Sequence, residues 1–328
     1  MRLTHKLTQL LLALVALAVL GPSALAADPG APFPATSELS DQKAGSILIY
    51  NVYNSNATNP LAENTRINIT NTNSTLGAFV HLFFIDGMTC SVADALICLT
   101  GNQTVSFLMS DIDPGIMGFL IAVASDPTTG CPVSFNCLIG DEYVRLGSNH
   151  TANLGAEAIA AIVPPLCTGL ASTVTIAFDG VSYNRLPRVL AADNIASSAD
   201  GNSTMLVINR IGGSLVTGVD NIGTIVGLAF DDVENGLSFQ LPFAGCQFKF
   251  VLSDSLPRTT PRLSVLIPTG RTGWMKFWAA TDVGILGAQI TANTSGTVGA
   301  FNGGHNLHKL TLTSAATLEL PIFTARCF

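Results

Sequence analysis

Residues 110–126 read SDIDPGIMGFLIAVASD, and the apolar run in this stretch indicates how the chain folds. A short run of Ile, Val, Leu, Phe and Ala between turn residues is typical of a buried β-strand. Asp111 and Asp113 precede the run beside a Pro-Gly pair, and turns favour Asp, Pro and Gly. We therefore interpret both aspartates as turn residues. A calcium site is the alternative, but calcium takes about six to eight oxygen ligands and this loop supplies two obvious carboxylates.

Runs of the same kind recur on both sides of this stretch. They include SILIYNVY (46–53), TRINITNTN (65–73), AFVHLFFIDG (78–87), QTVSFLMSD (103–111) and PVSFNCLIG (132–140). β-Branched and aromatic residues between turn residues, repeated about every ten positions, predict a β-sandwich or barrel. Only residues 153–163, NLGAEAIAAIV, indicate a helix, because Asn153 can cap its start and two prolines follow its end.

The strand pattern occurs twice along the chain. VHLFFID at 80–86 is followed by IDPGIMGFLIAVA at 112–124, and VGLAFDD at 226–232 is followed by IPTGRTGWMKFWA at 267–279. Aligning the second strings of the two pairs keeps their glycines in register but not their aspartates, which supports the turn interpretation. We therefore predict an all-β fold with two immunoglobulin-like β-sandwich domains in tandem and a short helix in the connecting segment.

The organisation that follows has five parts. They are a signal peptide at 1–26, a flexible arm at 27–44, a first sandwich at 45–150, a connector at 151–202 with the helix and a strand pair, and a second sandwich at 203–328. The strings TRINITNTN, VHLFFIDG and DIDPGIMGFLIAVA resemble those of bacterial secreted proteins with tandem immunoglobulin-like sandwiches. That resemblance implies the architecture alone and no catalytic residues.

The start of the chain predicts export. A basic beginning, an apolar stretch at 10–20 and a small-x-small site ending at Ala26 are typical of a secretory signal peptide. No later segment offers about 18 uninterrupted apolar residues, so no transmembrane anchor is expected. We expect a mature chain of 302 residues that is secreted, extracellular or at the cell surface, with the periplasm as the alternative.

Charge excludes one class of partner. Cleavage after Ala26 leaves 13 basic and 22 acidic residues, a net charge of about −9. Nucleic-acid binding depends on neutralising phosphates with Lys and Arg, so no nucleic-acid partner is expected. Charged residues make up 11% of the chain, well below the roughly 25% of an average soluble domain. A surface with so little charge is weakly protected against association.

Seven cysteines lie after the predicted cleavage site, and disulfides are the expected state of cysteines in an exported chain. The pairs that are close in sequence, or that would tie the last region together, are Cys90 with Cys98, Cys131 with Cys137, and Cys246 with Cys327. Cys167 is then left over. Spacing alone does not fix the connectivity.

Polar clusters offer two weak metal candidates. Asp231, Asp232 and Glu234 could hold calcium or act as glycosidase carboxylates, but the Asn-Gly pair that follows indicates a hairpin with solvated acids. His305 and His308 are the one close histidine pair. In a helix they would share a face for zinc, but the sequence around them indicates a strand, where residues three apart face opposite sides.

Trp274 and Trp278 are the candidate ligand-binding residues. They are four apart and share one face of a strand, from which they could stack on sugars. Packing in the core is the favoured alternative, since large aromatic side chains mostly supply buried area.

We expect no enzyme and no cofactor, because the sequence has no Gly-x-Ser-x-Gly elbow, phosphate-binding loop, dinucleotide fingerprint or His-Glu-x-x-His motif. The favoured function is a secreted or cell-surface structural protein that binds itself or a surface polysaccharide through open sheet edges, with the arm adding a strand to a neighbouring subunit. The alternatives are a carbohydrate-binding module, a secreted glycoside hydrolase and an outer-membrane β-barrel, the last because the chain ends in a strand closing on Phe328.

Overall fold

The computed structural model describes residues 29, 31–32, 39–147, 149–293, 295, 302–324 and 327. The predicted signal peptide and Phe328 lie outside these residues. Strands account for 54% of the chain, which confirms the all-β prediction. Among the described residues, no helix has the length and apolar character needed to cross a membrane.

The strands of the described residues form five sheets. Sheet I has the order β10 (Glu157–Ile159), β2 (Ile47–Asn54), β7 (Met117–Ser125), β4 (Ala78–Asp86) and β5 (Val92–Leu99). Sheet II has the order β6 (Thr104–Leu108), β3 (Asn64–Asn71), β8 (Leu138–Arg145) and β9 (Thr151–Gly155). Sheet III has the order β18 (Gln247–Val251), β13 (Asn202–Ile211), β20 (Gly284–Asn293) and β21 (Gly303–Asn306).

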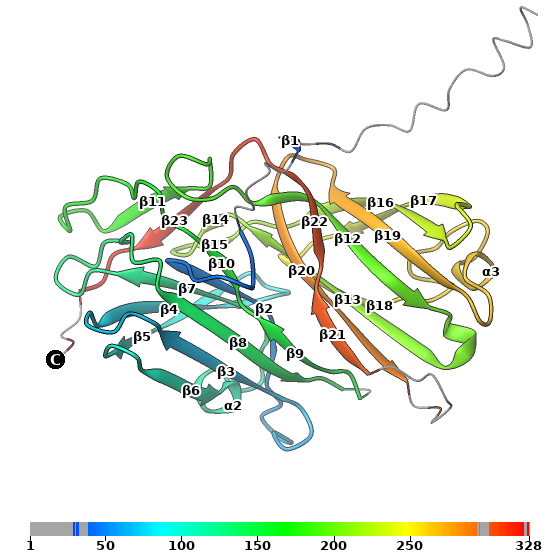
Figure 1. Ribbon diagram of the computed structural model, residues 1–328, viewed down its shortest axis with the longest axis horizontal. Helices are drawn as coiled ribbons and strands as arrows, with labels where there is room; N and C mark the ends of the chain where they lie inside the picture. Colours follow the sequence, from blue (N-terminus) through cyan, green and yellow to red (C-terminus); the bar gives the residue numbers. More distant parts are fainter. Residues whose placement is uncertain are drawn as a thin grey trace, which may run out of the picture.

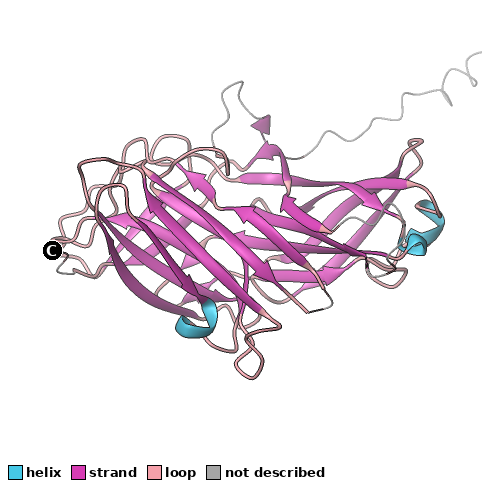
Figure 2. Ribbon diagram, turned by 60° about the horizontal axis from the view of Figure 1, so that its bottom comes forward, coloured by secondary structure: helices cyan, strands magenta, loops and turns pink. Residues whose placement is uncertain are grey.

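The other two sheets use strands from the end of the chain. Sheet IV has the order β1 (Ala31–Pro32), β22 (His308–Leu312), β12 (Pro187–Ala196), β19 (Thr272–Ala279), β16 (Gly223–Asp231) and β17 (Gly236–Phe243). Sheet V has the order β11 (Thr173–Ala177), β23 (Thr317–Pro321), β14 (Gly213–Ser214) and β15 (Gly218–Val219). The short helices α2 (Met109–Ile112) and α3 (Leu263–Leu266) lie in opposite halves of the molecule, α2 at the lower left and α3 toward the right-hand end of Figure 2.

The five small sheets are arranged as a five-blade β-propeller, so the prediction of two tandem immunoglobulin-like sandwiches is wrong. Sheets I, II and V lie on one side of Figure 1, and sheets III and IV lie on the other. The blades are not consecutive segments, since β22 and β23 pair with β12 and β11. The spacing of apolar runs locates strands, but which strands pair depends on contacts between distant parts of the chain.

Strand β7, the apolar run of residues 110–126, is the middle strand of sheet I and is buried on both faces. This is why its sequence is continuously apolar instead of alternating. One face packs in a core with sheet V through Phe119, Ile121, Val123, Ile176, Leu318 and Leu320. The other face packs in a core with sheet II through Leu120, Ala122, Ala124, Ile67, Ile69 and Leu138.

Sheets III and IV enclose a separate core. It contains Leu206, Ile208 and Ile285 of sheet III and Leu190, Met275 and Phe277 of sheet IV. A smaller cluster joins sheet III to sheet II through Val144, Leu154, Val207 and Ala288. The strands β13 and β20 therefore bury both of their faces, and sheet III connects the two sides of the molecule.

Buried amides tie sheet I to sheet III. Asn51 Nδ2 donates to Asn306 Oδ1 at 2.8 Å, and Asn209 Nδ2 donates to the Asn51 carbonyl oxygen at 2.8 Å. Gln247 Nε2 donates to Asn209 Oδ1 and to the Gly118 carbonyl oxygen, both at 2.9 Å. A buried amide without partners costs about 1–3 kcal/mol, so these bonds favour one relative placement of the two sheets.

The disulfides differ from the predicted pairs. Cys98 is bonded to Cys327, and Cys131 is bonded to Cys167. The predicted pairing of Cys98 with Cys90, of Cys131 with Cys137 and of Cys327 with Cys246 is therefore wrong, and Cys167 is not left over. Proximity in sequence did not decide the pairing. Cys327 comes after β23 of sheet V and is bonded to Cys98 in β5 of sheet I, 229 positions earlier. Cys90, Cys137 and Cys246 are unpaired thiols in the structure.

The helix predicted at 153–163 is also wrong. These residues lie in β9 and β10, which pair with β8 and β2. Alternate side chains of β9 are buried, and Glu157 in β10 is fully buried, with its carboxylate 2.7 Å from Lys309 Nζ. Alanine and glutamate favour helices, but intrinsic preference is worth less than about 1 kcal/mol per residue, and the two strand pairings override it. Of the strand pair predicted in the connector at 172–186, the structure has one strand, β11, and β12 begins after it at Pro187 in a different sheet.

The described part of the arm lies against its own chain. Ala31 and Pro32 pair with Leu312 and Thr311 of β22, and the Thr311 hydroxyl donates to the Pro29 carbonyl oxygen at 2.6 Å. Closer to the first sheet, Leu39 is buried and Ser40 bridges to Ala158.

Candidate metal centre

A β-bulge in β12 exposes Asp193. The pairing of β12 with β19 passes from Ala192 opposite Met275 to Ile195 opposite Gly273, so β12 carries one extra residue there. Asn194 within the bulge has a φ of 47°, in the left-handed region that Asn tolerates better than most residues. A bulge re-aims side chains, and this one directs Asp193 toward β21 and β22.

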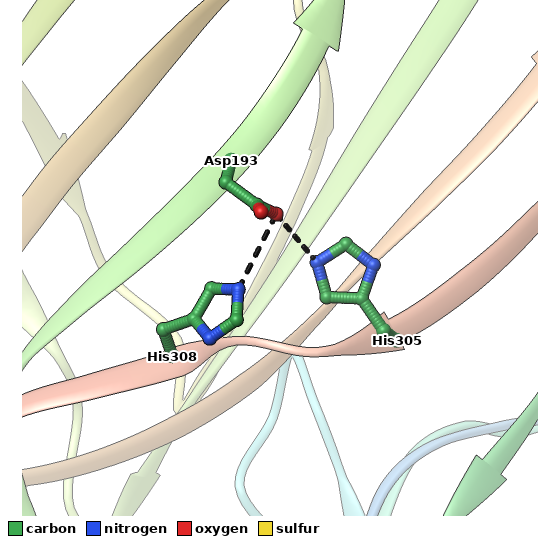
Figure 3. Close-up of side chains that lie close together, drawn as sticks. All are labelled: Asp193, His305 and His308. Carbon is green, nitrogen blue, oxygen red and sulfur yellow. Dashed lines mark ion pairs between the residues drawn. The ribbon is translucent and has the colours of Figure 1, made fainter.

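His305 and His308 reach Asp193 because the chain changes sheets between them. β21 ends at Asn306 in sheet III and β22 begins at His308 in sheet IV, with the buried Leu307 between the two strands. In one regular strand, residues three apart would face opposite sides, as we predicted. That prediction is wrong here, since the break at Leu307 turns both imidazoles to the same side (Figure 3).

The three side chains converge on one point. His305 Nε2 lies 3.1 Å and His308 Nε2 lies 3.4 Å from the same oxygen, Asp193 Oδ1. The ligand atoms of all three residues lie within 4.8 Å of one another. The side chains are about half exposed, at 53% for Asp193, 43% for His305 and 56% for His308, so an ion can reach them from solvent.

Two imidazoles and one carboxylate suit a divalent transition metal. Zinc, copper and nickel prefer nitrogen and oxygen ligands of this kind, whereas calcium and magnesium take oxygen alone. A tetrahedral zinc ion with ligands about 2.0–2.1 Å away holds those ligand atoms about 3.3 Å apart. The two distances to Asp193 Oδ1 are close to that separation, so the residues fit zinc with small side-chain adjustments and leave a fourth position open.

Gln289 is a buried residue that hydrogen-bonds to the backbone of the site. It is the cross-strand partner of His305, is 3% exposed, and donates from Nε2 to the Asp193 carbonyl oxygen at 2.9 Å. Its own Oε1 is buried and has no hydrogen-bond partner. A histidine that binds metal usually needs an acceptor for its other ring nitrogen, and the neighbouring amide oxygen is suited to that role.

An open groove of about 930 Å³ begins at His305. Its walls include amides and hydroxyls, among them Asn194, Asn202, Gln289, Thr291 and Asn293. Two charged side chains that line it already have partners, since Asp200 accepts from Gly270 N and Arg271 pairs with Asp232. The open coordination position of the site therefore adjoins a groove that offers several uncharged hydrogen-bonding groups.

The predicted carboxylate cluster does not converge. Asp231 closes the hairpin between β16 and β17 by accepting from Val233 N, Asn235 N and Asn235 Nδ2. Asp232 pairs with Arg271, whose Nε lies 2.7 Å from Asp232 Oδ2. Glu234 takes a positive φ of 69° in the same turn. Among the described residues, the group of side chains placed to hold a metal is Asp193 with the two histidines, and none of these carboxylates joins it.

Asp111 and Asp113, the aspartates that precede β7, lie in turn structure and not in a calcium site. Asp113 Oδ2 accepts from the Tyr53 hydroxyl at 2.7 Å, its carbonyl oxygen accepts from Ser55, and Gly115 has a φ of 88°. Asp111 lies in the single turn of α2 and does not join Asp113 in a ligand group of three.

The two tryptophans lie on the outer face of sheet IV. Met275 and Phe277, which alternate with them along β19, point into the core. Trp274 is 37% exposed and stacks on Phe230 with ring centroids 4.7 Å apart, and Trp278 is half-buried. Core packing, the favoured alternative at the level of sequence, does not describe Trp274.

Asp193 is the residue that sequence reasoning missed. The pair Asp193-Asn194 interrupts the apolar residues of β12, and an interruption of that kind can indicate a bulge. No feature of the sequence connects it with residues more than 100 positions later. Comparisons with family models, curated proteins and solved structures found no match.

Proposed function

We propose that this chain is an exported, non-enzymatic binding protein that holds one divalent transition-metal ion at Asp193, His305 and His308. The observation that carries the proposal is the shared oxygen, Asp193 Oδ1, lying 3.1 and 3.4 Å from two imidazole nitrogens. Zinc is the best fit to that geometry and ligand set.

One feature supports the exported part of the proposal. The two disulfides suit an oxidising compartment, as the predicted signal peptide requires.

Calorimetric titration of the chelator-treated protein with Zn²⁺ tests the site. One ion per chain is expected, with binding that weakens at acid pH because protons compete for the imidazoles. His305→Ala, His308→Ala and Asp193→Asn should each weaken binding by at least about 10-fold, since even outer-shell partners of a metal contribute that much.

The chain offers a matched control in Asp94→Asn. Asp94 Oδ2 lies 3.0 Å from His81 Nε2, so this pair has the same groups but no third ligand among the described residues. Zinc affinity should be unchanged in this variant. Equal losses in Asp94→Asn and Asp193→Asn would contradict the assignment of the site.

A hydrolysis assay tests the non-enzymatic part. The zinc-loaded protein should show no turnover of aryl esters, phosphate esters or aryl glycosides above free zinc. Turnover that disappears in His305→Ala would show that the site is catalytic.

A second candidate function is binding of a surface polysaccharide on the outer face of sheet IV. The favouring observation is the exposed Trp274, which stacks on the half-buried Phe230, since sugars stack on aromatic faces. Co-sedimentation with insoluble polysaccharides should fall in Trp274→Ala and persist in Phe323→Ala, since Phe323 is 46% exposed and lies beside His81 of sheet I. Retention of all binding in Trp274→Ala would remove this candidate.

A further inference from the structure

Two unpaired cysteines meet at one turn. Cys90 lies in the turn between β4 and β5, and Cys246 lies between β17 and β18, 156 positions later. Asp86 and Gly87 hold both of them. The Asp86 carbonyl oxygen accepts from Cys90 N at 2.9 Å and from Cys246 Sγ at 3.2 Å, and the Gly87 carbonyl oxygen accepts from Cys246 N at 3.2 Å.

Glycine makes the close approach feasible. A Cβ at Gly245, the residue before Cys246, would lie 2.8 Å from the Gly87 carbonyl oxygen, nearer than real Cβ atoms come to such a group. The segment before β18 can therefore lie directly on the turn that carries Cys90. Val219 N also donates to the Cys90 carbonyl oxygen at 3.1 Å, which fixes Cys90 from a third segment.

Both cysteines are buried where they meet at the Asp86 carbonyl oxygen. Cys90 is 5% exposed and Cys246 is fully buried. Burial raises the pKa of both thiols, and hydrogen bonding between the two side chains raises that of Cys246 further. Cys137, the remaining unpaired cysteine, is half-buried elsewhere and has Asn73 Nδ2 3.9 Å from its sulfur.

We propose that Cys90 and Cys246 form a third disulfide in the exported protein, which joins the β4–β5 turn of sheet I to the start of β18 in sheet III. Four cysteines are already bonded, so this pairing leaves Cys137 as the single thiol. The bond would cross the same boundary as the buried amides around Asn51. The proposal is independent of the metal centre.

The chemistry needs an oxidant, and we assign it to a disulfide-bearing thiol oxidant of the exporting compartment. One cysteine thiolate attacks the oxidant's disulfide and releases one thiol, and the second cysteine then attacks the mixed disulfide and releases the other. The two cysteines together lose two electrons and two protons, and the oxidant's disulfide becomes two thiols. Since the folded thiols have raised pKa values and are buried, the bond forms before the turn closes over them.

The test is alkylation with iodoacetamide in denaturant, without reductant, of full-length protein purified from an oxidising compartment. Intact mass should show one label per chain, and peptide mapping should place it on Cys137 and recover Cys90 linked to Cys246. Cys137→Ser should take no label. Three labels per chain, on Cys90, Cys137 and Cys246, or a linked peptide containing Cys137, would overturn the proposal.

A second variant distinguishes this bond from the two that the structure contains. Cys246→Ser should take two labels, on Cys90 and Cys137, while the Cys98–Cys327 and Cys131–Cys167 peptides remain linked. A single label in this variant would mean that Cys90 pairs elsewhere and would also overturn the proposal. The map of the unaltered protein decides the question even where this variant does not fold.

Discussion

The buried carboxyl group of Glu142 makes the stability of this protein depend on pH. Glu142 in β8 is fully buried between sheets I and II, where its two carboxylate oxygens accept from Val52 N at 3.2 and 3.4 Å. Burial raises its pKa well above the ordinary value, although the backbone donors oppose the shift. The folded chain therefore holds the proton of Glu142 more tightly than the unfolded chain does.

Glu142→Gln should make the protein relatively more stable as pH rises. A raised folded-state pKa contributes stability that is complete below the unfolded pKa of about 4.3 and is lost as pH rises through the folded pKa. The amide cannot titrate. The free energy of unfolding of the variant, relative to that of the unaltered protein, should therefore increase between pH 4 and pH 8. Urea unfolding at both pH values measures this, and an offset that is the same at both would contradict it.

Gln289 is a second residue with an effect beyond its size, because it positions the metal ligands without touching the ion. Gln289→Leu removes the bond to the Asp193 carbonyl oxygen and should weaken zinc binding by about 10-fold. Thermal unfolding in the presence of a chelator measures the stability of the metal-free protein, and so separates a loss of zinc affinity from a loss of stability. A loss of affinity matched by a large fall in metal-free stability would show that the role of Gln289 is structural alone.

Among the elements, β12 and the β21–β22 segment build the site through two irregularities. One is the extra residue in β12, and the other is the change of sheet at Leu307. Leu307 is 1% exposed and packs in the core between sheets III and IV. Because Leu307 is anchored in this core, His305 and His308 both face Asp193.

Leu307→Ala should cost about 2–5 kcal/mol of stability, as expected for a buried leucine that leaves a cavity. It should also weaken zinc binding, because the crossing between sheets loosens. Chemical denaturation with and without zinc measures both effects. Leu61→Ala is the control, since Leu61 is 84% exposed, and comparable losses in the two variants would refute the role given to Leu307.

Much of the secondary structure could be predicted from the sequence, and the pairing could not. The runs at 46–53, 78–87 and 118–126 correspond to β2, β4 and β7, because apolar runs between turn residues are local signals. The helix prediction at 153–163 was wrong because pairing with β8 and β2 outweighs the helical preference of an alanine-rich segment. The metal centre could not be predicted for a related reason, since its geometry depends on a contact between Asp193 and the distant segment that carries His305 and His308.

At the scale of the whole molecule, the sheets are interlocked along the chain. The last strands complete sheets IV and V, Cys327 is bonded to Cys98, and buried amides connect β2 with β13 and β18. The arm completes sheet IV from the other end by covering β22. The outer edge of β22 is thus occupied by Ala31 and Pro32 of its own chain.

Removal of residues 27–38 should increase self-association of the mature chain. Without β1, β22 becomes an open edge with unpaired backbone groups, and such edges pair with other chains. Light scattering coupled to size-exclusion chromatography should show larger species for residues 39–328 than for residues 27–328 at equal concentration. Larger species from the longer chain alone would instead favour exchange of the arm between subunits.

The metal centre exists only when these long-range pairings are formed, so locating the ion tests the fold and the function together. The most direct measurement is anomalous diffraction at the zinc absorption edge from crystals of the zinc-loaded protein. We predict one peak bonded to Asp193 Oδ1, His305 Nε2 and His308 Nε2 at about 2.0–2.2 Å. Zinc bound elsewhere, or no peak among these three side chains in protein saturated with zinc, would contradict the account.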